Sequence, residues 1–107
     1  MAGIDNREEG FEAKFAHDAT LRFKAGARRN KLLAFWAADL MGLSEDEKNE
    51  YAKAVIKSDF EEAGDEDVFR KIRADFDDKG VEQSDHQIRR TMGELMATAI
   101  QQIENGE

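Results

Sequence analysis

Five basic side chains lie close together between Arg22 and Lys31 and could bind an anionic group. Lys24, Arg28 and Lys31 are spaced four and three residues apart, so a helix would place them on one face. Such a face could hold an anionic group, for example a nucleotide phosphate, through charge-assisted hydrogen bonds. The competing interpretation is a solvated face that pairs with acidic helices elsewhere in the chain. The candidate anion-binding residues are Arg22, Lys24, Arg28, Arg29 and Lys31.

Other side chains that could do chemistry are isolated or poorly placed. The sequence has no cysteine, which excludes disulfides, thiolates and cysteine-ligated zinc. His17 and His86 each lack a second ligand at metal spacing. Asp75 and Asp77 begin like a calcium-binding loop, but Lys79 and His86 stand where oxygen ligands are needed. We therefore expect no catalytic residue, no metal site, no enzyme, and no cofactor beyond weak nucleotide binding.

The overall composition limits the class of protein. With 107 residues, 40% hydrophobic and 37% charged, the chain suits one soluble domain with a modest core. Its net charge of −8 disfavours nucleic acid as a partner, because phosphate contacts require basic surfaces. No apolar run approaches the roughly 20 residues that span a bilayer, and the start lacks a signal-peptide core. We expect a cytoplasmic protein without direct membrane insertion.

Helix start and stop signals divide residues 18–107 into four helices. Two starts carry a capping box, in which a serine is followed three residues later by glutamate or glutamine. Glycine, which ends many helices, follows three of the segments, and the sequence has no proline. The predicted helices begin at Asp18, Ser44, Asp65 and Ser84, and the first three end at Gly42, Gly64 and Gly80.

Apolar residues recur at helical spacing in all four segments, which predicts a small all-α fold, a four-helix bundle. The first and fourth helices are the longest and should pack together. The expected core comprises Leu21, Ala25, Leu32, Trp36 and Leu40, then Tyr51, Ala52, Val55, Ile56 and Phe60, then Val68, Phe69, Ile72 and Phe76, and finally Ile88, Met92, Leu95, Met96, Ala99, Ile100 and Ile103.

A short amphipathic segment, residues 1–17, precedes this bundle. Ile4, Phe11 and Phe15 are spaced seven and four residues apart and would share one face of a helix. Gly10 weakens such a helix, and isolated helices of fewer than about 12–15 residues rarely persist in water. We therefore expect a mobile N-terminal arm that folds on a partner, ahead of a bundle domain at residues 18–107.

Residues 17–33, HDATLRFKAGARRNKLL, resemble the zeta subunit of alphaproteobacterial F1Fo-ATP synthases, an ATPase inhibitor family once classed as a domain of unknown function. The resemblance continues in order along the chain, which makes it specific. It includes residues 35–38 (FWAA), 51–55 (YAKAV), 58–61 (SDFE), 67–71 (DVFRK) and 88–92 (IRRTM).

The resemblance implies a regulatory subunit that inhibits ATP hydrolysis. In that family the bundle docks on the F1 head, and the N-terminal segment enters a catalytic interface between alpha and beta subunits near gamma. It also implies a bacterial protein held at the inner membrane through F1, and we expect a monomer when free. The alternative is a small helical sensor that binds an anion at the basic helix. The candidate contacts in the arm are Ile4, Asp5, Arg7, Glu8, Phe11, Glu12, Lys14 and Phe15.

Overall fold

The computed structural model describes residues 19–60 and 65–106, with side chains from Leu21 onward. These residues form four α-helices and no strand, which confirms the predicted all-α four-helix fold. The helices are α2 (Ala19–Met41), α3 (Glu45–Ser58), α4 (Glu66–Lys79) and α5 (Asp85–Glu104). The predicted arm, Asp18 and Gly64 lie outside the described residues.

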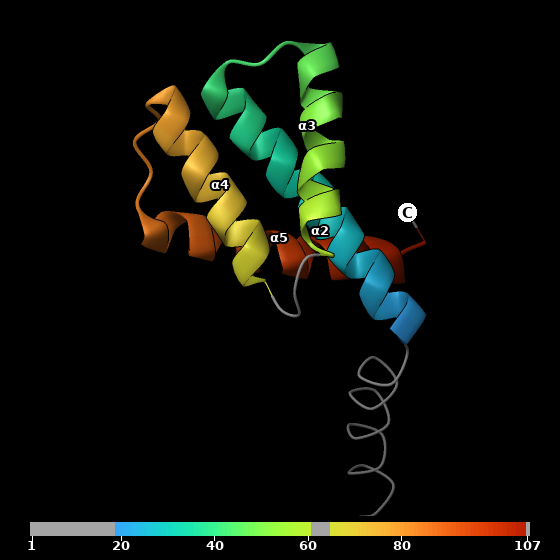
Figure 1. The fold of residues 1–107 in the computed structure, drawn as a ribbon. Coiled ribbons are helices and arrows are strands. Elements are labelled where there is room, and N and C mark those ends of the chain that lie inside the picture. The colour runs from blue at the N-terminus through green and yellow to red at the C-terminus, as the bar shows by residue number, and fades with distance from the viewer. Residues whose placement is uncertain (1–18, 61–64, 107) are drawn as a thin grey trace, which may run out of the picture.

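Helix α2 is the centre of the arrangement and packs against all three other helices. The turn at Gly42 reverses the chain, so α3 runs back beside α2 (Figure 1). In Figure 1, α4 and α3 lie on opposite sides of the upper part of α2, and α4 contacts both of these helices. Helix α5 crosses beneath them, and the end of α5 lies near the beginning of α2 (Figure 1). The predicted packing of the first helix against the fourth is confirmed.

Both predicted capping boxes are present. The Ser44 hydroxyl accepts from the Glu47 backbone N–H at 3.3 Å, and the Glu47 carboxylate accepts from the Ser44 N–H at 2.8 Å. Ser84 and Gln87 make the equivalent pair at 3.1 and 2.9 Å. Each box satisfies two N–H groups that a helix start leaves without partners.

Helix α4 starts and ends in different ways. It ends at Lys79 and is capped by Gly80, whose φ of 73° is a left-handed conformation that glycine adopts without strain. At its start, Asp65 occupies the predicted N-cap position, but its side chain makes no capping hydrogen bond. The Asp65 carboxylate instead accepts from Arg29 of α2. The chain between α3 and α4 is thus tied to the central helix.

The buried core contains all of the predicted residues of α4 and fewer of those of α2. Val68, Phe69, Ile72 and Phe76 are all buried, as expected from their spacing. In α2, however, Leu40 is 41% exposed, and Leu32 and Trp36 are only partly buried. The residues that α2 buries completely are Ala25, Leu33, Ala34, Ala37 and Ala38, with Arg29 and Asn30.

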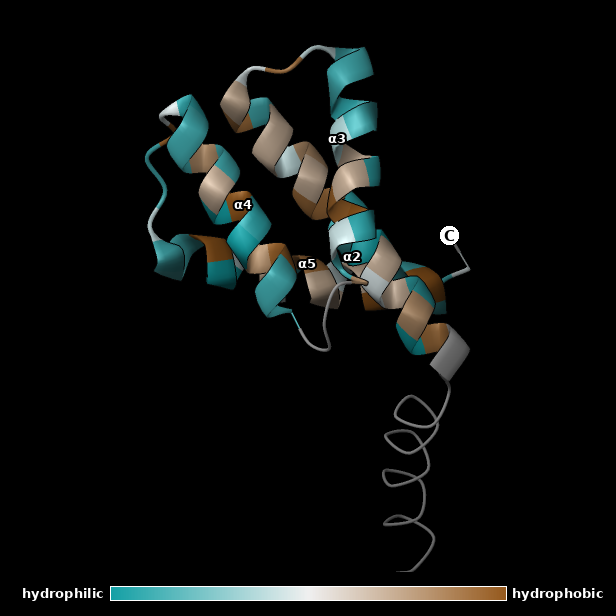
Figure 2. Cartoon of the chain, viewed as in Figure 1, coloured by the Kyte–Doolittle hydropathy of each residue, from teal (hydrophilic) through white to brown (hydrophobic). Residues whose placement is uncertain are grey.

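The prediction for α2 was only partly correct, because it assigned one apolar face to a helix with neighbours on several sides. Ala25 is buried as predicted, and Trp36 packs against the core. Small alanine side chains let α3 and α5 approach the α2 backbone closely, while Leu32, Trp36 and Leu40 lie at the margins of the packed surface. Trp36 is such a residue and packs edge-on against Phe76, with ring centres 5.6 Å apart. Figure 2 shows the resulting pattern, with hydrophobic positions clustered where the helices face one another.

Phe60 was also predicted to be buried, but its side chain is 66% exposed. Helix α3 ends at Ser58, whose buried hydroxyl donates to the Val55 carbonyl at 2.7 Å. Phe60 lies in the turn after the helix, where helical spacing no longer determines direction. On α5, Ile88, Met92 and Ala99 are buried, whereas Leu95, Met96, Ile100 and Ile103 are partly exposed.

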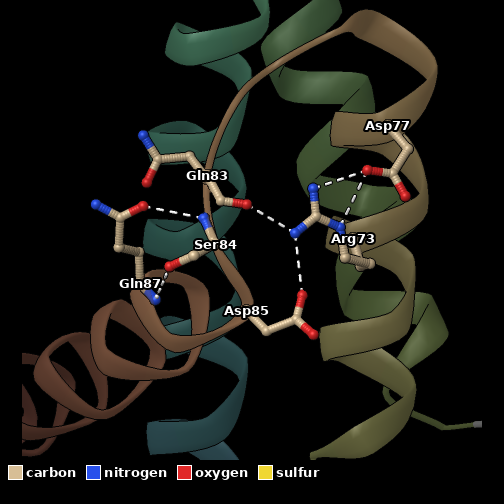
Figure 3. A network of polar contacts seen from close by, with 6 residues as sticks. All are labelled: Arg73, Asp77, Gln83, Ser84, Asp85 and Gln87. Carbon is tan, nitrogen blue, oxygen red and sulfur yellow. Dashed lines mark hydrogen bonds and ion pairs between the residues drawn. The ribbon is translucent and has the colours of Figure 1, made fainter.

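A polar network fixes the connection from α4 to α5 (Figure 3). The Arg73 guanidinium donates to the Gln83 carbonyl at 2.7 Å and to Asp85 Oδ1 at 3.0 Å. It also donates to Asp77 Oδ1 at 2.7 Å. One side chain on α4 therefore holds both the linker and the first residue of α5, which sets the direction in which α5 leaves.

Candidate functional site

The five basic residues of the predicted anion site do not form one cluster. Lys24, Arg28 and Lys31 line one side of a single groove of about 620 Å³. Arg29 lies on a different side of α2 and is buried, with 2% of its side chain exposed. Arg22 is exposed and does not line this groove. The structure therefore brings together three of the five candidates.

The groove combines cations with an apolar floor. Helix α2 contributes Phe23 and Ala27, α3 contributes Ile56, and the end of α5 contributes Ile103 and Gly106. No acidic residue of the described chain lines it. Such a surface favours a ligand that carries both negative charge and apolar groups.

The basic side chains of the groove differ in their partners. Arg28 donates from Nη1 to Gln102 Oε1 at 3.3 Å. Lys31 Nζ lies 5.8 Å from the centre of the Phe35 ring. Neither Lys24 nor Lys31 forms an ion pair with an acidic residue of the described ranges. Two cations at the groove are thus available to an outside anion.

Two exposed aromatic rings enlarge the apolar surface at one end of the groove. Phe23 is 60% exposed and Phe60 is 66% exposed, and their ring centres are 6.0 Å apart. Aromatic pairs at this separation attract each other, but most of both surfaces here remains in water. A partner could therefore still bury a large apolar area at this position.

Arg29 serves the interior of the bundle. Its Nε donates to Asn30 Oδ1 at 2.6 Å, and its Nη2 donates to Asp65 Oδ1 at 2.9 Å. These contacts pair the buried guanidinium within the protein. Nearby, burial raises the pKa of Asp59, while the positive charge of Arg29 opposes the shift. Arg29 therefore contributes to packing and to the position of the α3–α4 connection.

A second hollow of about 540 Å³ lies beside Arg29, but internal contacts satisfy its charges. Arg89 donates two hydrogen bonds to the Glu66 carboxylate, at 2.8 and 3.2 Å. The Arg89 guanidinium also lies 3.9 Å from the centre of the Phe69 ring, a cation–π contact. Hydrogen bonding to Arg89 lowers the pKa of Glu66. This hollow is a weaker candidate for an anion than the groove.

The acidic residues that resembled a calcium loop belong to helix α4 and pair internally. Asp75 accepts from the Tyr51 hydroxyl at 2.7 Å and from Lys71 Nζ at 3.1 Å. Asp77 pairs with Arg73 at 2.7 Å. Burial raises the pKa of Tyr51 well above its usual range, with the bond to Asp75 as a second cause. Within residues 19–60 and 65–106, no three His, Cys, Asp or Glu side chains are grouped to hold a metal.

The predicted contacts of the arm and His17 lie outside the described residues. His86 is exposed at the beginning of α5. None of the four described helices is long and apolar enough to cross a membrane. The outlying arm residues are Ile4, Asp5, Arg7, Glu8, Phe11, Glu12, Lys14 and Phe15.

Sequence reasoning missed the apolar half of the groove. Phe23 and Ala27 have the same spacing of four as Lys24 and Arg28, so an apolar row runs beside the basic one. This signal was available in the sequence. The contributions of Ile56 and Ile103 were not, because only the tertiary fold brings α3 and α5 to the same side of α2.

Comparison with known proteins identifies the family of this chain. A search of curated proteins finds no match. Among solved structures, the chain is similar to a protein determined by solution NMR, with 46% sequence identity and a TM-score of 0.72. That similarity covers 81% of this chain and 99% of the other. The family described as ATPase inhibitor subunit zeta matches residues 1–102. The chain therefore belongs to the ATPase inhibitor subunit zeta family.

Proposed function

We propose that this protein inhibits ATP hydrolysis by the F1 sector of ATP synthase. The observation that carries the proposal is the family match, which extends over residues 1–102 and so includes the arm as well as the bundle. In the proposed division, residues 1–17 are the inhibitory arm and residues 18–107 are the docking domain. The arm enters an interface between alpha and beta subunits near gamma, and the bundle docks on the F1 head.

A mechanical block of this kind needs no catalytic group. A wedge that occupies the interface prevents the movement that accompanies hydrolysis, so we propose a regulatory protein that is not an enzyme. The ion pairs of the described helices support this view, because Asp75, Asp77 and Glu66 are all paired with side chains of the same bundle. An arm that becomes ordered only on F1 loses conformational entropy there, which limits affinity but permits release.

The proposed partners also define the location. The alpha, beta and gamma subunits of F1 are the expected contacts, and the protein is a monomer when free. It resides in the cytoplasm and reaches the inner membrane only through F1. The negative total charge of −8 argues against nucleic acid as a competing partner.

The test is ATP hydrolysis by a matching F1 sector, titrated with this protein. Burial of one phenylalanine side chain contributes about 1.5–3 kcal/mol, so Phe11→Ala with Phe15→Ala should weaken inhibition by about two to four orders of magnitude. Leu40→Ala is a suitable control, since it removes an exposed apolar side chain at the far end of α2. A double variant that inhibits as well as the parent would show that the arm is not the wedge.

A second candidate function is an anion sensor at the groove. The observation in its favour is that Lys24, Arg28 and Lys31 lie together beside an apolar floor. Nucleotide should then produce saturable NMR shifts in the amides of residues 23–31, and Lys24→Glu with Lys31→Glu should abolish them. Shifts confined to other residues would remove this candidate.

A further inference from the structure

The groove on α2 has the properties of a docking surface. Phe23, Ile56 and Ile103 supply apolar area, and the exposed Phe60 ring continues it. Lys24 and Lys31 project cations that have no acidic partner among the described residues. A matching occupant must therefore present an apolar stripe with carboxylates beside it, which is the chemistry of an acidic amphipathic helix.

The chain itself contains such a segment. Residues 4–15 have Ile4, Phe11 and Phe15 at helical spacing. The other positions of this segment include four acids, Asp5, Glu8, Glu9 and Glu12, against two bases, Arg7 and Lys14, so its net charge is −2. We propose that the groove binds the N-terminal arm of the same chain, with Phe11 and Phe15 on the apolar floor and the acids beside the lysines.

The connection between arm and groove permits this contact. The arm joins the first residue of α2, Ala19, and the groove begins at Phe23, about one helical turn further on. Two antiparallel helices can be joined by a loop of about 2–5 residues, and residues 16–18 would supply it. An arm that returns along α2 brings Phe15 toward the Phe23 end of the groove. At 1.5 Å per residue, Glu12 is then carried toward Lys24 and Glu8 toward Arg28. Asp5 lies furthest along the arm, toward Lys31. Because the two segments are covalently joined, their effective concentration is high.

Docking in the groove has a consequence for inhibition, and this step rests on the function proposed above. The face made by Ile4, Phe11 and Phe15 cannot contact the groove and F1 at the same time. The docked chain is therefore inactive, and its apparent affinity for F1 is reduced by the fraction of chains with a free arm. Substitutions that weaken the groove should make the protein a stronger inhibitor.

Docking can be measured first in the free, full-length protein. The chain has no cysteine, so Ala13→Cys carries a single nitroxide label away from the apolar face of the arm. Amides of residues 23–31, Ile56 and Ile103 should be broadened by the label. Lys24→Glu with Lys31→Glu should reduce this broadening several-fold. The matched control, Lys79→Glu with Arg90→Glu, makes the same charge change at exposed positions outside the groove and should leave it unchanged.

The comparison between variants separates docking from the effect of the tether. A nearby label broadens the groove amides to some extent even when the arm never binds, and this contribution is the same in all three proteins. Equal broadening in the parent and in the groove variant would therefore overturn the proposal. Melting curves of both variants serve to show that the bundle is intact.

Titration of F1 with each variant then shows whether docking of the arm weakens inhibition. The groove variant should reach half-inhibition at a roughly 3- to 10-fold lower concentration than the parent, because more chains have a free arm. The control variant should match the parent. Weaker inhibition by the groove variant would overturn the proposal and show that the groove contacts F1 instead, and unchanged inhibition would overturn it as well. If the parent itself does not inhibit, the proposed function fails, while the NMR comparison still decides whether the arm docks.

Discussion

Replacement of Arg29 by methionine should destabilise the bundle through a lost hydrogen bond more than through a lost ion pair. Methionine keeps an apolar stem of similar length but has no donor. Asn30 Oδ1, which accepts from Arg29 Nε at 2.6 Å, would lose that bond inside the protein. A buried acceptor without a donor costs about 1–3 kcal/mol.

The ion pair contributes less. Asp65 is 57% exposed, so water screens its attraction for Arg29, and exposed pairs contribute about 0–1 kcal/mol. The total expected cost of Arg29→Met is therefore about 1–4 kcal/mol. Asp65→Asn removes only the ion pair and should cost at most about 1 kcal/mol.

Urea denaturation followed by circular dichroism measures both variants and the double variant. The difference between the double variant and the sum of the single ones isolates the Arg29–Asp65 interaction, which should not exceed about 1 kcal/mol. If Asp65→Asn is as costly as Arg29→Met, the ion pair dominates and the reasoning is refuted. An unchanged midpoint for Arg29→Met would show that the buried guanidinium contributes nothing to stability.

Three further outcomes are expected. Ile72→Ala should lower the free energy of unfolding by about 2–5 kcal/mol, and Leu95→Ala by clearly less, because Ile72 is fully buried and Leu95 is not. The urea denaturation midpoints of the two variants compare these losses directly. Burial and the hydrogen bond to Asp75 raise the pKa of Tyr51 in the folded state. The protonated hydroxyl therefore stabilises the fold, and this stabilisation is lost as the pH rises above about 10, the pKa of an unfolded tyrosine. Melting curves at about pH 8 and pH 11 should show a decrease that Tyr51→Phe reduces. Deletion of residues 1–17 should leave the melting temperature within a few degrees of the parent, since the core lies wholly within the described helices.

Features that depend on neighbouring residues in the sequence were predictable. The capping boxes at Ser44 and Ser84 follow from contacts three residues apart, and the structure contains both. The buried face of α4 was also predicted correctly. Its apolar residues, among them Val68 and Ile72, all point to one side, so a single periodic pattern describes them.

Features that depend on which helices meet were not predictable in the same way. Helix α2 buries Ala34, Ala37 and Ala38 because other helices approach it from several directions, and hydropathy alone favours its larger residues. The groove could be predicted only in part for the same reason. Its basic row on α2 follows from the sequence, but Ile56 and Ile103 join it only through tertiary packing.

The last helical turn of α5 should let the groove open on warming before the bundle unfolds. Ile103 and Gly106 form part of the groove wall, whereas the buried residues of α5 are Ile88, Met92 and Ala99. Helix ends open locally at a lower free energy than the core, so this wall should fray while the bundle remains folded. Hydrogen exchange should therefore be faster at residues 103–105 than at Met92. Warming would then open the groove well below the melting temperature, and temperature could control it without global unfolding.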